Sequence, residues 1–411
     1  MELASGVQQG DGFQPLSKAR RGFAFGVVLT SAFGACLVFS LLPPILPALA
    51  RHFGGGRTGE LSAQFAMTMP SLGWLIGGAI SGWVLARTGV RWMIIVSMGA
   101  LGLLGAIGGL APDVGSFLAT RLVLGFAGAF MVTACVTLLT NVYEEEARPK
   151  MIGYMKAMAG AGGIPIGVAA GALAKMLEWR APFSLYAVFG VLAVVFAWAA
   201  VPADRPVAAV AAKTAAEKGK IWRLWPLLLL IFFLHIILMM GVTQMPFLLA
   251  EHGVTSPTTL SLAIAAGALL MSVGSVASGH LQVRFGAAPV LALAVSTAAA
   301  GCVVVGLASS IVVVVAGNTL AVLGCGIYFP QYLTLPLSRV SPGDRGAAIG
   351  LVQAAMYLGA FFNPIILAPA RGLLGLSGTY TAVGLVAASA VAIGVGRTLL
   401  HNGARAKAAR A

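Results

Sequence analysis

Apolar stretches separated by short polar segments run along the whole 411-residue chain. Each stretch is close to the ~20 residues that a helix needs to cross the hydrocarbon core of a bilayer. The pattern therefore predicts an all-α membrane protein with 12 transmembrane helices. We expect these helices at residues 23–46, 61–85, 92–111, 116–139, 152–174, 183–202, 225–249, 259–280, 289–309, 311–335, 347–368 and 378–399.

One segment of the chain occurs twice. The sequence GGAISGWVLARTG, Gly77 to Gly89, returns as GSVASGHLQVRFG, Gly274 to Gly286. The offset of 197 residues continues without a gap to Ala157 and Ala354. The matching positions inside the segment are Gly82 with Gly279, Arg87 with Arg284 and Gly89 with Gly286. We therefore expect two homologous halves, as in one large class of membrane transporters.

The boundary between the halves is the one long polar connection, which is rich in Ala and Lys. It divides the chain into five parts. These are a cytoplasmic tail (1–22), an N-terminal six-helix bundle (23–202), a central cytoplasmic loop (203–224), a C-terminal six-helix bundle (225–399) and a second cytoplasmic tail (400–411).

Composition and charge agree with a membrane protein. Charged residues make up 9% of the chain, against about 25% in soluble domains. Of the 26 Lys and Arg residues, 19 fall on the side of the predicted helices that holds both termini and 5 on the other. This bias places both termini in the cytoplasm, and we expect a multi-pass protein of a bacterial inner membrane. The net charge of +14 thus requires no nucleic acid partner.

The two halves, the long central loop and the Gly-x3-x-Arg-x-Gly loops together resemble the major facilitator superfamily, over residues 22–400. The run from Arg121 to Gly125 and the sequence Trp179-Arg180-Ala-Pro182-Phe183 are similar to motifs of its twelve-helix drug/proton antiporter branch. The resemblance implies a major-facilitator-type fold with two pseudo-symmetric bundles. Its substrate site would lie at the midplane and be exposed alternately to each side.

The resemblance also assigns gating and packing residues. The gating loops would contain Gly82, Arg87, Gly89 and Arg91, and Gly279, Arg284 and Gly286. The expected packing and kink positions are Gly125 and, in the fifth helix, Gly163, Pro165 and Gly167, where small residues let helices approach closely. The chain departs from the family at Ala86 and Val283, where the loop motif has an Asp. We therefore expect a weaker latch, with Arg87 and Arg91 acting mainly as topology anchors.

Ionisable groups inside the predicted helices are candidates for function because they are costly in a bilayer. All 12 acidic residues lie in loops, tails or helix edges, which argues against a central carboxylate that carries protons. His235 lies near the midplane and suits a proton carrier, although a neutral His bonded between helices is an equal alternative. Arg121 would face the transport path, and its alternative is a structural Arg bonded to backbone carbonyls.

Uncharged polar residues complete the predicted substrate and proton path: Gln244, Asn318, Gln331 and Asn363. Their usual role in lipid is hydrogen bonding between helices, and the resemblance favours the first three for the path. Aromatic and Met residues in the seventh and tenth helices, such as Phe329 and Tyr332, could form an adaptable pocket. Plain packing is the stronger alternative for that patch.

These observations predict a secondary transporter that exports small amphipathic compounds in exchange for protons. One alternative is a carrier of an anionic organic metabolite, suggested by Arg121 and His235. Another is a transporter-like sensor or assembly protein. The chain has no phosphate-binding loop and no residue spacing typical of a metal site. We expect no enzymatic activity, no ATP and no metal or cofactor, only a proton gradient, a small-molecule substrate, the lipid bilayer and a monomeric state.

Overall fold

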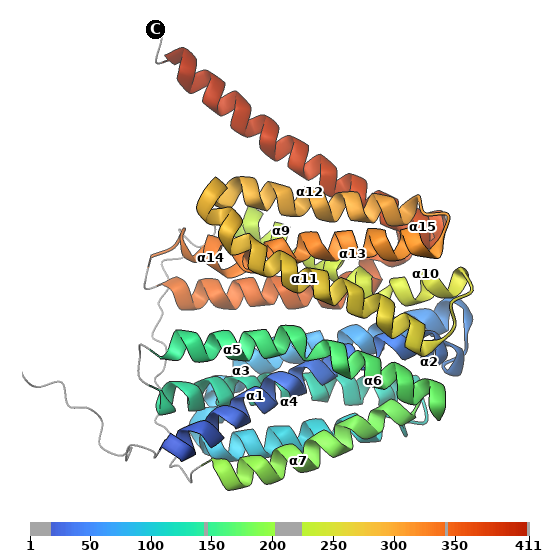
Figure 1. Ribbon diagram of the computed structural model, residues 1–411, viewed down its shortest axis with the longest axis vertical. Helices are drawn as coiled ribbons and strands as arrows, with labels where there is room; N and C mark the ends of the chain where they lie inside the picture. Colours follow the sequence, from blue (N-terminus) through green and yellow to red (C-terminus); the bar gives the residue numbers. More distant parts are fainter. Residues whose placement is uncertain (1–17, 144–146, 202–223, 342–343, 409–411) are drawn as a thin grey trace, which may run out of the picture.

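The computed structural model describes residues 18–143, 147–201, 224–341 and 344–408. The predicted first tail up to residue 17, the central loop from 203 to 223 and residues 409–411 lie outside this part of the chain. The described residues form helices joined by short turns, with no strand among them. The predicted all-α class is therefore confirmed (Figure 1).

The helices of the first half pack on one another and form what we call the N-terminal group. It consists of α1 (Lys18–Ser40), η1 (Pro43–Ile45), α2 (Leu46–His52), α3 (Gly56–Gly108), α4 (Val114–Val142), α5 (Arg148–Ala161), α6 (Gly163–Met176), η2 (Ala181–Phe183) and α7 (Ser184–Ala200). The breaks after α1 follow from the Pro residues near its end, which cannot donate a backbone hydrogen bond inside a helix.

The helices of the second half form the C-terminal group, the upper layer in Figure 1. It consists of α9 (Trp225–Thr243), α10 (Met245–Glu251), α11 (Pro257–Phe285), α12 (Ala287–Gly306), α13 (Ile311–Tyr328), α14 (Gln331–Leu337) and α15 (Arg345–Ala408). The helical chain thus continues beyond residue 399, where the sequence analysis ended the last helix, and also begins at Lys18 rather than at residue 23.

Nine helical stretches of the described chain are long and apolar enough to cross a membrane by length and composition. Two of them are double length. α3 has 53 residues and bends at Gly89, and α15 has 64 residues and bends at Gly375. A further membrane-length segment is divided at Gly162 into α5 and α6. The arrangement is compatible with the predicted 12 transmembrane helices.

The two copies of the repeated segment end in the same backbone conformation. Gly89 has φ 76° and ψ 165°, and Gly286 has φ 83° and ψ 166°. This region of backbone space is open almost only to Gly, because a Cβ would clash there. The repeated glycine therefore supplies the sharp turn that joins α11 to α12 and that divides α3.

A side-chain cap fixes the start of α4. The Asp113 carboxylate accepts a hydrogen bond from the backbone N–H of Ser116 (2.9 Å), and the Ser116 hydroxyl bonds back to the same carboxylate. These bonds, first the backbone one and then the side-chain one, hold the pKa of Asp113 below its usual value. Such a cap satisfies N–H groups that the first helical turn leaves unpaired.

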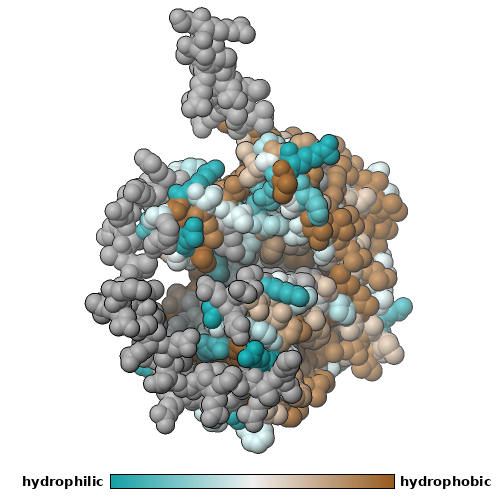
Figure 2. Space-filling view, turned by 60° about the vertical axis from the view of Figure 1, so that its left-hand side comes forward, coloured by the Kyte–Doolittle hydropathy of each residue, from teal (hydrophilic) through white to brown (hydrophobic). Residues whose placement is uncertain are grey.

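Apolar side chains cover the outside of the two groups. On α7, for example, Val191 and Leu192 are each 65% exposed, and large apolar areas face outward in Figure 2. A soluble monomer rarely exposes such continuous apolar surface, whereas a bilayer favours it. The outer faces of the helices therefore suit lipid, and polar chemistry is concentrated between them.

The N-terminal and C-terminal groups meet along two pairs of helices, α6 with α11 and α3 with α15. Thr258 at the start of α11 donates a hydrogen bond to the Gly171 carbonyl of α6 (3.3 Å). The short helices α2 and α10 also touch at this end of the molecule, at the right of Figure 1. We call it the α2–α10 end.

Candidate functional site

A cavity of about 500 Å³ lies between the two groups. Its walls come from α1, η1, α3, α4, α5 and α6 on one side and from α9, α11, α14, α15 and the turn before α14 on the other. The volume is in the ~300–1,000 Å³ range of small-molecule sites. On the face shown in Figure 2, the surface between the two groups is hollowed. A site of this kind can receive a small molecule from one side while both groups contact it.

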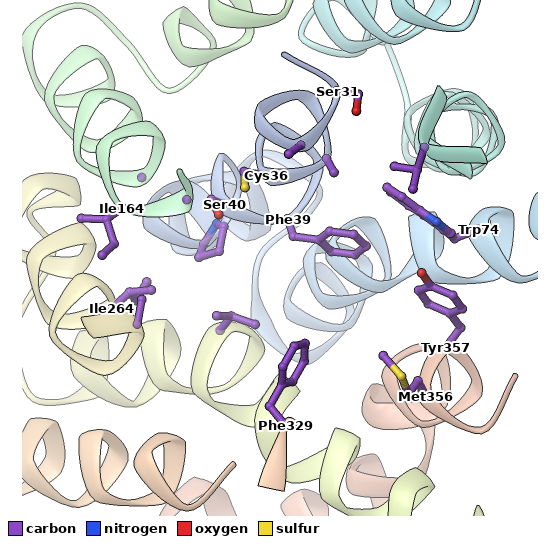
Figure 3. A pocket seen from close by; sticks show the side chains of 18 of the residues that line it. Ser31, Cys36, Phe39, Ser40, Trp74, Ile164, Ile264, Phe329, Met356 and Tyr357 are labelled. Atoms are coloured by element: carbon purple, nitrogen blue, oxygen red, sulfur yellow. The ribbon is translucent and has the colours of Figure 1, made fainter. Parts of the chain in front are cut away.

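Aromatic rings form one wall of the cavity. Phe39 and Trp74 come from the N-terminal group, and Phe329 and Tyr357 come from the C-terminal group (Figure 3). The ring centroids of Phe39 and Trp74 are 5.6 Å apart. Trp74 stacks on Tyr357 across the boundary, with centroids 6.2 Å apart and an angle of 23° between the planes. The wall is thus continuous across the two groups.

The opposite wall is aliphatic. Ile164 of α6 and Ile264 of α11 lie across the cavity from the aromatic rings (Figure 3). Small side chains, among them Ser40 and Cys36, lie between the two walls. The cavity therefore lies between an aromatic and an aliphatic surface, with small side chains between them.

The polar groups among the described side chains that line the cavity are neutral. The Ser31 hydroxyl donates to the Val28 carbonyl (2.7 Å), and the Ser261 hydroxyl donates to the Thr258 carbonyl (2.8 Å). Each hydroxyl oxygen keeps lone pairs that can accept a hydrogen bond. Gln353 adds an amide. Among the described side chains that line the cavity there is no Asp, Glu, Lys, Arg or His.

Polar contacts close the molecule at the α2–α10 end. The Arg371 guanidinium of α15 forms an ion pair with the Glu60 carboxylate of α3 and donates to the Gln244 carbonyl oxygen (3.3 Å). The amides of Gln64 and Gln244 approach each other at 3.1 Å. Arg57 donates to the Ala368 carbonyl (2.8 Å). We call these residues the cross-group network, since its bonds join the two groups, apart from the bond between Arg371 and Gln244, which links two segments of the C-terminal group.

Arg121 lies inside the N-terminal group and is fully buried. Its guanidinium donates to the Tyr186 hydroxyl (3.4 Å) and to the Gly105 carbonyl (3.3 Å). The guanidinium carbon is 5.1 to 5.4 Å from the ring centroids of Phe117, Phe183 and Tyr186. Arg121 does not line the central cavity. These contacts match the structural alternative, an Arg that ties neighbouring helices together.

Replacing Arg121 separates its packing role from a role in transport. Arg121→Ala should destabilise the protein by about 2–4 kcal/mol, because a large buried side chain leaves a void. Arg121→Met should cost much less, since an apolar side chain of similar volume replaces a buried charge. Thermal unfolding of the purified protein measures both. A Met variant that is stable but unable to transport would instead place Arg121 in the transport path.

His235 lies in the C-terminal group, between α9, α13 and α15. Its Nδ1 is 3.1 Å from the Ile231 carbonyl, so Nδ1 carries a hydrogen and Nε2 is the acceptor when the ring is neutral. The ring meets Tyr328 edge to face, with centroids 6.3 Å apart. His235 is 5% exposed and does not line the central cavity. Its proposed role as a proton carrier stays a prediction.

The other predicted path residues are buried at separate places. Gln244 belongs to the cross-group network. Asn363 donates to the Ile236 carbonyl (2.9 Å) and accepts from the Thr243 hydroxyl (3.0 Å). Asn318 lies against Gly241. Within the described structure, both amide atoms of Gln331 lack a hydrogen-bond partner. The structure therefore does not bring the predicted set together at one site.

The predicted gating loops make contacts within their own groups. The Arg87 guanidinium lies 3.5 Å from the centroid of the Trp83 ring, and Arg91 donates to the Trp198 carbonyl of α7 (3.1 Å). Arg284 lies over the ring of Phe285. A Cβ added at Gly82 or at Gly279 would meet open space. Gating by these residues stays a prediction.

The predicted packing glycines lie at two helix contacts. A Cβ at Gly125 would be 2.2 Å from the Pro70 carbonyl oxygen, and one at Gly163 would be 2.6 Å from the Ser40 hydroxyl. Gly163 and Gly167 line the central cavity, directly after the break at Gly162, and Pro165 is exposed. Small residues here keep α1 and α4 close to their neighbours and leave the cavity open.

Sequence reasoning missed several residues of the cavity. Phe39, Trp74 and Tyr357 show no spacing in the sequence that distinguishes them from packing residues. Of the aromatic and Met patch that was singled out, Phe329 and Tyr332 do line the cavity. Gln353 also lines the cavity but was not among the predicted path residues. Only the three-dimensional arrangement shows that these side chains face one space.

Comparison with known proteins places the chain in a family. The model of the family described as "Major Facilitator Superfamily" matches residues 28–364. Multidrug resistance protein 1 of Bacillus subtilis (strain 168) is 27% identical over 178 residues, 43% of this chain and 44% of that protein. The puromycin resistance protein pur8 of Streptomyces alboniger is 29% identical over 183 residues, 42% of this chain and 35% of that protein. The chain thus matches less than half the length of these curated relatives.

Solved structures share the fold over nearly the whole chain. A bacterial homologue of the human lysosomal transporter Spinster, in an inward-facing and unoccupied conformation, superposes with a TM-score of 0.69 at 15% identity. The match covers 92% of this chain and 95% of that one. At this identity the likeness concerns the fold, which agrees with the two groups of helices described above.

Proposed function

The chain belongs to the Major Facilitator Superfamily, and on that premise we propose that it exports small amphipathic compounds across a membrane in exchange for protons. The observation that carries this proposal is the central cavity, with its aromatic and aliphatic walls and its neutral polar groups. The names of the relatives, two of which are a multidrug and a puromycin resistance protein, support export of such compounds.

The orientation of the chain is part of the proposal. The Lys and Arg bias supports a bacterial inner membrane with both termini in the cytoplasm. The α2–α10 end then faces outward, and the hollowed face in Figure 2 borders the cytoplasm. In this state a compound inside the cell would reach the cavity, and the cross-group network would separate it from the exterior. Alternating access requires this network to open in the opposite state.

None of the described side chains that line the cavity carries a positive charge that would favour the anion carrier that the sequence left open. Arg121 and His235, which motivated it, make their contacts inside the two groups of helices. We propose that the transporter works as a monomer, driven by the proton gradient without ATP or a bound cofactor, and we keep His235 as the candidate proton carrier.

Accumulation of dyes, antibiotics and organic acids in a pump-deficient bacterial host tests the proposal. We expect the protein to lower accumulation of several apolar compounds several-fold, and a protonophore to abolish the effect. Ile264→Trp, which fills the cavity, should lose export. Leu262→Trp should keep it, because Leu262 is on the same helix, outside the cavity and 56% exposed.

Three other outcomes would contradict the proposal, and each would indicate a different function. A response limited to organic acids would make the protein an anion carrier. A response that survives the protonophore would remove proton exchange. If no compound responds while Ile264→Trp and the parent protein are equally well folded, a sensor or assembly role takes the place of export.

A further inference from the structure

The aromatic wall of the central cavity is built for flat rings. Phe39 and Trp74 are tilted by 34°, and Trp74 and Tyr357 by 23°, so three rings from α1, α3 and α15 present faces at moderate angles to one another. Phe329 also lines the cavity and lies below Phe39 in the view of Figure 3. A flat aromatic molecule can lie against such a wall in offset-stacked or edge-to-face contact.

The ring of Trp74 is held in place from behind. A Cβ added at Gly128 of α4 would be 2.5 Å from the Trp74 ring, so the indole packs directly on the backbone of α4. Its own side chain is 8% exposed. Because the ring is packed on one side and faces the cavity on the other, its position is set before a ligand binds. A preset ring loses little conformational freedom on binding.

The remaining polar groups match a neutral partner. Ser31 and Ser261 can accept hydrogen bonds, and the amide of Gln353 can both donate and accept. Two arginine side chains that could have carried charge into the cavity make their contacts outside it. Arg371 is paired with Glu60, and Arg121 is surrounded by rings and carbonyls. Transfer of an unpaired charge into an apolar cavity costs several kcal/mol.

From these contacts we infer that the cavity binds uncharged, planar aromatic compounds with one or two hydrogen-bonding groups, held between the Phe39–Trp74–Tyr357 wall and Ile164 with Ile264. The inference rests on the proposed function for the site but adds the class of ligand. It separates this protein from a carrier selective for organic cations or for organic anions, which would place opposite charges in the cavity.

Three tricyclic probes of one shape test the class of ligand. Acridine is uncharged at mildly alkaline pH, N-methylacridinium is a cation and acridine-9-carboxylate is an anion. Binding is measured by probe fluorescence with the full-length protein in lipid nanodiscs, without a proton gradient, and with empty nanodiscs as the blank. We expect acridine to bind at least ten-fold tighter than either charged probe. Tighter binding of the cation or of the anion overturns the inference.

Matched variants test the site. Trp74→Ala should weaken acridine binding roughly ten-fold or more, since it removes a ring contact together with its buried area. Trp92→Ala should leave binding unchanged, because Trp92 is on the same helix but 58% exposed. Trp74→Phe keeps a ring and should retain most of the affinity. Phe329→Leu provides a second variant if Trp74→Ala folds poorly. Equal losses in Trp74→Ala and Trp92→Ala overturn the inference.

The same probes distinguish this inference from the proposed function. Acridine that binds through Trp74 but is not exported by cells would refute export and leave the ligand class intact. Export of N-methylacridinium alone, abolished by a protonophore, would refute the ligand class and leave proton-driven export intact.

Discussion

Replacing Arg371 with Ala should open the α2–α10 end of the molecule. Arg371 pairs with Glu60 and also donates to Gln244, and its guanidinium lies 5.4 Å from the centroid of the Phe247 ring. The two charged side chains are 12% and 30% exposed. Exposed ion pairs contribute little to stability, and disrupting buried pairs is costly. We expect this partly buried pair to have an intermediate effect.

The expected size of the effect follows from a shift between the states with the α2–α10 end closed and open. If the network exists only when the α2–α10 end is closed, its loss removes on the order of 1–2 kcal/mol from that state alone. This corresponds to a roughly 5- to 30-fold change in the ratio of closed to open molecules. Glu60→Gln should act in the same direction. A charge exchange, Glu60→Arg with Arg371→Glu, should restore part of the closed population.

Cys36 provides the readout, because it lines the central cavity and is 6% exposed. A membrane-impermeant maleimide applied at the α2–α10 end should label Arg371→Ala several-fold faster than the parent protein. A Cys36→Ser background gives the baseline. Arg180→Ala is the matched control, since Arg180 lies at the same end but donates to Gly109 within the N-terminal group. Equal labelling of both Arg variants would contradict a closing role for the network.

Replacing Gly73 with Ala should severely destabilise the protein. A Cβ at Gly73 would be 2.1 Å from the Leu122 carbonyl oxygen and 3.0 Å from the Gly125 Cα. These are backbone atoms of α4, so no side-chain rotation can relieve the clash. The two helices must separate along their contact, and we expect a loss of several kcal/mol, at the upper end of the range for overpacking.

A glycine on the same helix provides the control. A Cβ at Gly82 would meet nothing within 4 Å, and Gly82→Ala should raise stability slightly, by about 0.5–1 kcal/mol, because it restricts the unfolded chain. The apparent unfolding temperature of the detergent-solubilised protein, followed by size-exclusion chromatography, compares the two. Similar temperatures for both variants would show that α3 and α4 do not need this close approach.

Sequence reasoning found the fold because its signals are local and repeated. The length of the apolar stretches fixed an all-α membrane protein, and the offset of 197 residues linked Gly89 to Gly286. The structure gives these two glycines the same backbone conformation, which shows why both copies retain Gly. The sequence did not show that some neighbouring helices are joined without a loop. In α3 and α15 the chain is helical on both sides of a single bent residue, Gly89 and Gly375.

The candidate site was much harder to predict. Intramembrane charge drew attention to Arg121 and His235, but each is surrounded by its own group of helices. Glu60 was placed at a helix edge, and nothing local connects it to Arg371, 311 residues away. Trp74 and Tyr357 meet only because the two groups pack together. Contacts between distant segments depend on the tertiary arrangement, which single-sequence patterns do not contain.

If the proposed proton exchange holds, the neutral polar groups of the described cavity lining would determine which part of the proton-motive force drives it. If an uncharged compound leaves while one proton enters, each cycle carries one net positive charge inward. The membrane voltage then contributes about 2.3 kcal/mol per 100 mV, equivalent to an additional concentration ratio of about 50-fold. Exchange of a monovalent cation for one proton moves no net charge and would depend on the pH difference alone. In the proposed mechanism, the net charge moved in each cycle would thus depend on cavity side chains that are themselves uncharged.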